Sequence, residues 1–386
     1  MNIKSLLLGS AAALLAVSGA RAADAVVVAE PEPAEYVKIC DVYGAGYFYI
    51  PGTETCLRVG GYIRYDAGLG DVGTLDGAKT TDRLNGEKQE TYAKNARFAL
   101  RTWTGQETEL GTLKTFTETR FNFSNGQGAS AGNVNDKGEN RVSLNFAWIQ
   151  LGGLRVGKDE TAYDSFIGYA GNVIQDTLIP YGGKDTNLIS YTFDAGSGFS
   201  GILSLEQGSG GYSRIKRVGD TWTADNNTID SYVPHVVGGL KYKGDWGSIT
   251  GVAAYNSAYE EWAGKVRLDV NATSELTLFV MAGYGSDDNI DRNQYKPWGG
   301  NWAVWGGGTY KFDSKTKFNA QVSLDDNRSL AIAANVAYEI VPGFTITPEV
   351  DFVHEGRFGK ADYLNSWTKA DKKNSLGGIV RFQRNF

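Results

Sequence analysis

From Cys56 onward, apolar and polar residues alternate along the chain with a period of two. Within 57–66, apolar residues occupy most odd positions, and polar, charged or glycine residues occupy most even ones. The same alternation returns at 318–325 and at 330–340. Side chains of a β-strand point to opposite faces in turn, so this period predicts strands with one apolar and one polar face.

Sixteen segments follow this pattern. The predicted strands span 56–67, 93–104, 111–124, 142–152, 154–158, 186–194, 198–207, 233–243, 246–256, 260–270, 276–285, 301–311, 316–325, 330–340, 344–355 and 374–386.

Connections between these segments alternate between short and long. Short ones include Gly152-Gly153 and Val341-Pro342-Gly343, and the longer ones include 68–92, 125–141, 159–185, 208–232, 286–300 and 356–373. Two connections on the long side, near 257–259 and 326–329, are shorter than the rest. Tight turns on one side and long loops on the other are typical of up-and-down barrels of the bacterial outer membrane.

The predicted fold is therefore all-β, a 16-stranded antiparallel transmembrane β-barrel. A β-sandwich pair, a propeller or a β-solenoid are the soluble alternatives. No repeat of fixed length is visible, which argues against a propeller. Several predicted strands are long for a sandwich, whereas tilted membrane crossings need such lengths.

The N-terminal residues predict export. Lys4 precedes an apolar run from Leu6 to Val17, and Ala20-Arg21-Ala22 fits a cleavage site. We expect a signal peptide at 1–22, a periplasmic lead-in at 23–55 and the barrel at 56–386. The run is too short for a membrane-spanning helix, which argues against the alternative of an anchor helix.

Charge narrows the class of partner. The segment 1–22 carries Lys4 and Arg21 and no acid, so its removal changes the net charge from −6 to −8. An acidic chain is not expected to bind nucleic acid, because nothing offsets repulsion from the phosphates.

Cys40 and Cys56 are the only cysteines. An exported chain meets an oxidising compartment, so a disulfide is favoured. A metal or redox pair is the alternative, but no histidine lies near them in the sequence and their spacing matches no zinc pattern.

Two stretches carry a resemblance to a known family. The stretch 46–66, GYFYIPGTETCLRVGGYIRYD, resembles the opening of alphaproteobacterial general porins, and the chain end 378–386, GIVRFQRNF, resembles theirs and that of many outer-membrane barrels. The resemblance implies a homotrimeric, sixteen-stranded porin of the outer membrane, with both family cysteines present. It also implies that Phe386 belongs to a signal read by the barrel-assembly machinery, although an aromatic residue at a barrel rim also suits the lipid interface.

A barrel of this size leaves an aqueous channel, and rings of charge at a constriction filter what passes. The resemblance implies that the third long connection, 159–185, folds into the lumen. We expect Asp159, Glu160 and Asp164 on it to face arginines on the lumen side of the wall. Those arginines are Arg58, Arg64, Arg97, Arg101, Arg120 and Arg155. Weaker candidates on the lumen side are Lys265, Arg267, Glu339, Glu349, Asp351 and Arg381.

Enzyme, metal and cofactor signatures are weak. Gly128-Ala129-Ser130-Ala131-Gly132 fits G-x-S-x-G, but it lies in a glycine- and asparagine-rich loop rather than between a strand and a helix. The run from Asp287 begins like a calcium loop, yet its sixth position is Arg292 and its twelfth is Trp298. We expect a solvated acidic loop there, no enzyme activity and no cofactor.

Two function classes remain. The first is a general pore that passes small hydrophilic solutes and ions in a membrane of lipid and lipopolysaccharide. The alternative is a substrate-specific channel or a barrel adhesin. A sugar channel needs aromatic residues along its lumen, and most strand aromatics here fall on the outward positions, which favours the general pore.

Overall fold

The chain divides into two units, Met1–Lys38 and Ile39–Phe386. The computed structural model describes residues 38–72, 77–125, 139–182, 185–209, 214–218, 221–225, 227–360 and 372–386. The predicted signal peptide and the start of the lead-in, as well as the G-x-S-x-G run at 128–132, lie outside these residues.

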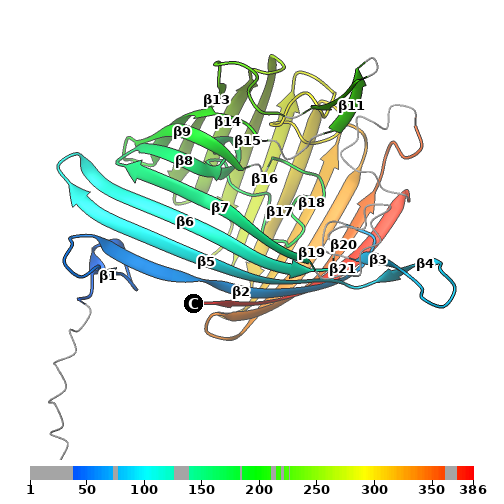
Figure 1. Cartoon of the computed structure of the whole chain (residues 1–386), viewed down its shortest axis with the longest axis horizontal. Coiled ribbons are helices and arrows are strands. Elements are labelled where there is room, and N and C mark those ends of the chain that lie inside the picture. The colour runs from blue at the N-terminus through cyan, green and yellow to red at the C-terminus, as the bar shows by residue number, and fades with distance from the viewer. Residues whose placement is uncertain are drawn as a thin grey trace, which may run out of the picture. The chain divides into compact units, whose positions relative to one another are not determined.

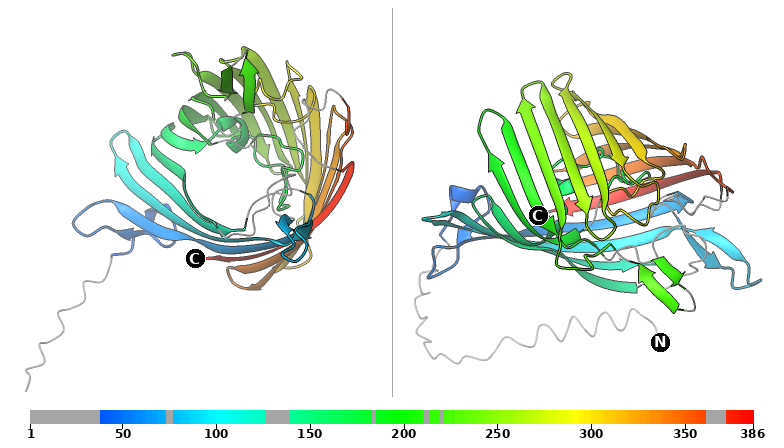
Figure 2. Two further views of the ribbon diagram at one scale, coloured as in Figure 1. Left: turned by 45° about the vertical axis from the view of Figure 1, so that its right-hand side comes forward. Right: turned by 90° about the horizontal axis from the view of Figure 1, so that it is seen from above.

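Sixteen long strands form one closed antiparallel barrel (Figures 1 and 2). Each strand pairs with the next along the chain, and β2 closes the ring by pairing with β21. The strands are β2 Cys56–Gly70, β5 Ala93–Thr108, β6 Gly111–Ser124, β7 Glu139–Leu151, β8 Leu154–Glu160, β9 Asp185–Asp194, β10 Phe199–Glu206, β13 His235–Gly244, β14 Gly247–Asn256, β15 Glu261–Asn271, β16 Leu276–Gly285, β17 Trp302–Lys311, β18 Thr316–Asp325, β19 Leu330–Val341, β20 Phe344–His354 and β21 Asn374–Asn385.

All sixteen predicted strands are present, with boundaries that differ by a few residues. The short elements in the lead-in and in the connections were not predicted. They are η1 Asp41–Tyr43, β1 Phe48–Tyr49, β3 Ala78–Thr81, β4 Lys88–Thr91, α2 Ala162–Ser165, β11 Arg214–Val218 and β12 Thr221–Asp225. Such short elements contain too few residues to show a period in the sequence. The predicted alternation of short and long connections is present in the structure.

Every strand separates two faces. On the outer face, large apolar side chains are exposed, among them Val59, Ile63, Leu240, Val266 and Val350. We call the alternating positions the inner face, and they carry the six predicted arginines and most of the buried polar groups. No helix within the described ranges combines the length and apolar character of a transmembrane span.

The buried apolar cluster lies on one side of the barrel. It joins residues of 162–181, such as Tyr163 and Ile179, to inner-face residues of β13 to β20, such as Met281 and Trp305. The arginine-bearing strands β2, β5, β6 and β8 contribute nothing to this cluster among the described residues.

The lead-in and the chain end both attach to β2. Cys40 and Cys56 form a disulfide bond, and β1 pairs with the start of β2. At the other terminus, the backbone of Phe386 exchanges two hydrogen bonds with Gly61, N to O 3.1 Å and O to N 3.0 Å. The Phe386 ring stacks on Phe98, with 6.4 Å between the ring centroids.

Candidate pore-lining site

The segment 161–182 leaves the barrel wall where β8 ends. Thr161 caps the four-residue helix α2 by accepting a hydrogen bond from the backbone N–H of Tyr163, N to Oγ1 3.2 Å. Glu206, on the inner face of β10, accepts from Thr161 Oγ1 at 2.6 Å and from the Ala162 N–H at 2.8 Å. The start of the segment is thus bound to β10, which is separated from β8 by β9.

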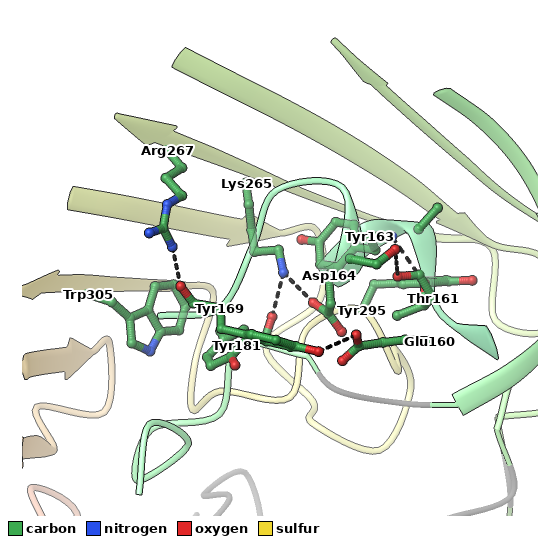
Figure 3. A network of polar contacts seen from close by, with 12 residues as sticks. Glu160, Thr161, Tyr163, Asp164, Tyr169, Tyr181, Lys265, Arg267, Tyr295 and Trp305 are labelled. Atoms are coloured by element: carbon green, nitrogen blue, oxygen red, sulfur yellow. Dashed lines mark hydrogen bonds and ion pairs between the residues drawn. The ribbon is translucent and has the colours of Figure 1, made fainter. Parts of the chain in front are cut away.

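Lys265 and Asp164 form a buried ion pair between β15 and this segment (Figure 3). Lys265 Nζ donates to Asp164 Oδ1 at 2.5 Å and to the backbone oxygen of Tyr181 at 2.8 Å. The ammonium also lies 4.0 Å from the centre of the Tyr163 ring. Both charged side chains are fully buried, so the pair acts as an anchor for the segment rather than as an exposed charge.

Further inner-face groups bind the segment along its length. Arg267 donates to the backbone oxygen of Tyr169, and Trp305 Nε1 donates to that of Ile179 at 2.8 Å. Gln321 Nε2 donates to the backbone oxygen of Asp176 at 2.8 Å.

The carboxylate of Glu349 holds the middle of the segment. It accepts from the N–H of Ile174 at 2.5 Å and from the N–H of Gln175 at 2.7 Å. Asn335 Nδ2 donates to the same carboxylate at 2.7 Å. Buried backbone N–H groups that lack a partner in a helix or sheet need such acceptors. The Glu349 carboxylate therefore takes the place of the strand carbonyl groups that would accept these hydrogen bonds in a sheet.

Two acids, Glu160 at the end of β8 and Asp176 within the segment, remain partly accessible. Glu160 accepts a hydrogen bond from the Tyr169 hydroxyl at 2.7 Å. Asp176 accepts from the Tyr181 hydroxyl at 2.6 Å. Burial raises the pKa of Asp176 to about 6, and the Tyr181 hydrogen bond opposes that shift. Burial likewise raises the pKa of Tyr181 well above its usual range, and the Asp176 carboxylate raises it further.

The predicted arginines all lie on inner-face positions of β2, β5, β6 and β8. Arg58 lies over the Trp103 ring at 4.6 Å, Arg64 Nε donates to Gln383 at 2.7 Å, and Arg97 Nε donates to Asn122 at 2.7 Å. These three side chains are held by neutral partners.

The other three arginines pair with acids. Arg101 and Arg120 both bind the buried carboxylate of Glu118, which the sequence did not single out. Arg155 Nη1 binds Asp159 at 2.6 Å. Of the predicted loop acids, Asp159 is thus brought to an arginine, Asp164 to a lysine, and Glu160 to a tyrosine.

Several residues that hold the segment were only weaker candidates in the sequence, or were not predicted. Lys265, Arg267 and Glu349 were recognised as inner-face charges but only as weaker candidates, and Glu206 was not considered. A charge at an inner-face position is visible in the sequence, but the loop that it meets is not. A second connection also differs from expectation. The loop 286–301 is solvated only in part, because Asp288 and Arg292 are exposed whereas the aromatic residues Tyr295 and Trp298 are buried.

Comparison with known proteins agrees with this architecture. Residues 24–379 match the model of a family described as "Porin subfamily". Porin Omp2b of Brucella canis and porin Omp2b of Brucella abortus are each 53% identical over 389 residues, with 100% of both chains covered.

Solved structures with low sequence identity share the fold. The outer membrane channel DcaP of Acinetobacter baumannii aligns with a TM-score of 0.56 at 15% identity, over 88% of this chain and 99% of that one. A triple mutant of the Rhodopseudomonas blastica porin aligns with a TM-score of 0.51 at 16% identity, over 86% and 100%. The family match and the relatives identical over half of their residues decide the assignment: the chain belongs to the porin subfamily, and it is a general diffusion channel of the outer membrane.

Proposed function

We propose that residues 161–182 fold into the lumen as the third loop and narrow the channel for small hydrophilic solutes and ions. The observation that carries this proposal is the set of inner-face groups that bind the segment, from Glu206 on β10 to Glu349 on β20. These partners lie on strands far apart around the ring. A segment bound to all of them crosses one side of the channel and leaves the arginine side open.

The charges on the two sides differ in sign. Asp176 lies within the segment and Glu160 directly before it at the end of β8, whereas Arg58, Arg64 and Arg97 lie on β2 and β5 with neutral partners. The other arginines are largely neutralised by Glu118 and Asp159. We expect a field across the constriction that orients dipolar solutes and slows apolar ones, without any catalytic step.

Reversal potentials in planar bilayers test the charge assignment. The triple variant Arg58→Gln, Arg64→Gln, Arg97→Gln should shift selectivity toward cations, and the double variant Glu160→Gln, Asp176→Asn should shift it toward anions. Lys315→Gln, in a short turn outside the strands, is the matched control and should leave the potential unchanged. Unchanged potentials in both charge variants would refute the filter.

A substrate-specific channel is the second candidate, favoured by one observation. The inner-face rings of Trp103, Phe116, Phe146 and Trp148 contact one another, with centroids 5.3 to 5.8 Å apart. Sugar rings stack on such aromatic surfaces, so this patch offers a place for a solute to bind. Concentration-dependent block of the ion current by a sugar would favour a substrate-specific channel. An ion current that no sugar blocks would favour the general pore.

Assembly and targeting complete the proposal. We infer that residues 1–22 are removed as a signal peptide, that 23–55 form a periplasmic lead-in, and that the mature chain is a homotrimer. We further infer that the barrel-assembly machinery reads Phe386, and that lipopolysaccharide contacts the outer-face apolar band. The support is the family membership, the exposed outer face and the position of Phe386 at the strand that closes the ring.

A further inference from the structure

The connection between β16 and β17, residues 286–301, is packed like a protein core. Tyr295 is 1% exposed, and Lys296 and Trp298 are fully buried. A loop that reached out from the barrel into water would leave such large side chains solvated.

Inner-face groups bury the two aromatic side chains. The Tyr295 hydroxyl donates to Glu206 Oε2 of β10 at 2.9 Å, and its ring meets that of His235 of β13 edge-on, with centroids 5.9 Å apart. Trp298 packs edge-on against Trp305 of β17, with centroids 5.5 Å apart. A Cβ added to Gly283 of β16 would lie 2.8 Å from the Trp298 ring, so the glycine makes room for it.

From these contacts we propose that residues 286–301 form a second internal loop, which fills part of the barrel and braces the segment 161–182 in its position. This inference deepens the proposed function and rests on it, since the braced segment is the one that narrows the channel.

The brace consists of one carboxylate and one pair of rings. Glu206 accepts hydrogen bonds from Thr161 and Ala162 of the first segment and from Tyr295 of the second loop. The Tyr295 ring also meets the Tyr163 ring edge-on, with centroids 5.3 Å apart (Figure 3). A movement of either loop therefore breaks contacts of the other.

The second loop has an internal framework of its own. Lys296 Nζ donates to the backbone oxygens of Asp288 at 3.0 Å and Gly300 at 2.8 Å. Asn301 Nδ2 donates to Gly285 O at 2.9 Å, and Arg292 pairs with Asp287 at 2.9 Å. These contacts close the loop on itself, as a support that holds a neighbour in place requires.

Tyr295→Phe is the sharpest test, because it removes one hydroxyl and keeps the ring. The loss of a hydrogen bond to a charged acceptor should raise the population of a released loop about tenfold. Single-channel recordings should then show new conductance substates and greater open-channel noise. Tyr284→Phe is the control, since Tyr284 lies exposed on the outer face of β16.

Three further variants make the outcome decisive. Glu206→Gln should give at least the same noise, because it weakens the hydrogen bonds from Thr161 and Ala162 as well as the one from Tyr295. Adding Tyr295→Phe to Glu206→Gln should add little, because the contact that it removes is already weakened. Replacement of 287–297 by a short glycine–serine link, in protein that still forms heat-resistant barrels, should raise the conductance. If the conductance and noise of Tyr295→Phe match those of Tyr284→Phe, the brace does not exist.

The first segment can be probed separately. Lys265→Met acts on 161–182 without touching the second loop. If this variant alters the current and Tyr295→Phe does not, the inference falls and the proposed function stands. If neither variant alters the current, the constriction itself falls.

Discussion

At the scale of single residues, buried charges hold an irregular segment against side chains of regular strands. Lys265 supplies an ammonium to Asp164, and Glu349 supplies a carboxylate to two consecutive N–H groups. Each of these two side chains forms hydrogen bonds with buried polar groups, whose burial without a partner would cost free energy. The position of 161–182 therefore depends on a few side chains rather than on a continuous ladder.

Lys265→Met should release this segment. Removal of one partner from a buried ion pair lowers the free energy of unfolding by about 3–5 kcal/mol, because the remaining charge stays buried without its partner. We expect faster proteolysis between β8 and β9 in an otherwise intact barrel. The double variant Lys265→Met, Asp164→Asn removes both charges and should be cleaved more slowly than the single variant. Equal cleavage of the single variant and the wild type would contradict the anchor.

Asp176 should make selectivity depend on pH. Burial raises its pKa to about 6, so the carboxylate is mostly ionised at pH 7.5 and mostly neutral at pH 5. Its raised pKa also means that the packed segment is favoured as the pH falls through about 6. Cation preference, measured as the reversal potential, should fall over that interval. In Asp176→Asn this part of the change should vanish, and an identical pH profile would argue against the assignment.

At the scale of elements, two small features fix how connections meet the barrel. Gly182 has φ +150°, and a Cβ added there would lie 1.9 Å from Asp164 Oδ1. The disulfide ties the lead-in to β2, where β1 contributes only two residues of pairing. The first feature depends on the close approach of Gly182 to Asp164. The second depends on the covalent bond between Cys40 and Cys56.

Gly182→Ala should displace the Asp164 carboxylate from Lys265, because the added methyl group and the carboxylate cannot share that space. Open-channel noise should rise, and we expect the same rise in Lys265→Met, which breaks the same ion pair. Gly251→Ala is the matched control, since a Cβ there meets no atom within 4 Å. Similar recordings from the two alanine variants would show that the contact is unimportant.

Reduction of the Cys40–Cys56 bond should free the lead-in without opening the barrel. A disulfide across a loop of this length contributes about 3 kcal/mol in the chain-entropy model, whereas β2 pairs along both of its edges. Limited proteolysis with and without reductant, followed by mass spectrometry, should show new cuts within 38–55 only. Cys40→Ser should behave like the reduced protein, and loss of the barrel band would contradict this division.

At the scale of the whole molecule, closure of the ring brings the two ends of the barrel sequence together. β21 pairs with β2 from Tyr62 and Asn385 to Gly70 and Gly377, and Phe386 adds the last backbone contacts. The ring has no free edge, so every strand is hydrogen-bonded on both sides. The terminal residue thus takes part in the seam as well as in any signal for assembly.

Phe386→Ala separates these two roles. If the assembly machinery reads the aromatic ring, the amount of barrel in the outer membrane should fall severalfold, while refolding of the purified chain into detergent should be unchanged. Phe98→Ala removes the stacking partner of that ring and serves as the control for packing. A normal amount of Phe386→Ala protein in the membrane would contradict the signal.

The strands and their faces were predictable because alternation is a local property. A residue at an inner-face position of β15, such as Lys265, can be placed on that face from its neighbours alone. The aromatic residues Tyr295 and Trp298 are equally visible in the sequence, but nothing in the sequence shows that they are buried. Loops lack a period that would show which side of the wall they occupy.

The sequence pattern alone was sufficient to predict the all-β class, the number of strands and the two faces of each strand. Every strand that crosses the membrane repeats the same alternation of apolar and polar residues. Only the closed barrel decided that Lys265 meets Asp164, that Glu349 holds Ile174, and that Tyr295 and Thr161 share Glu206. The members of these sets are separated by 45 to 175 residues. Their meeting follows from the curvature of the ring, which no local pattern encodes.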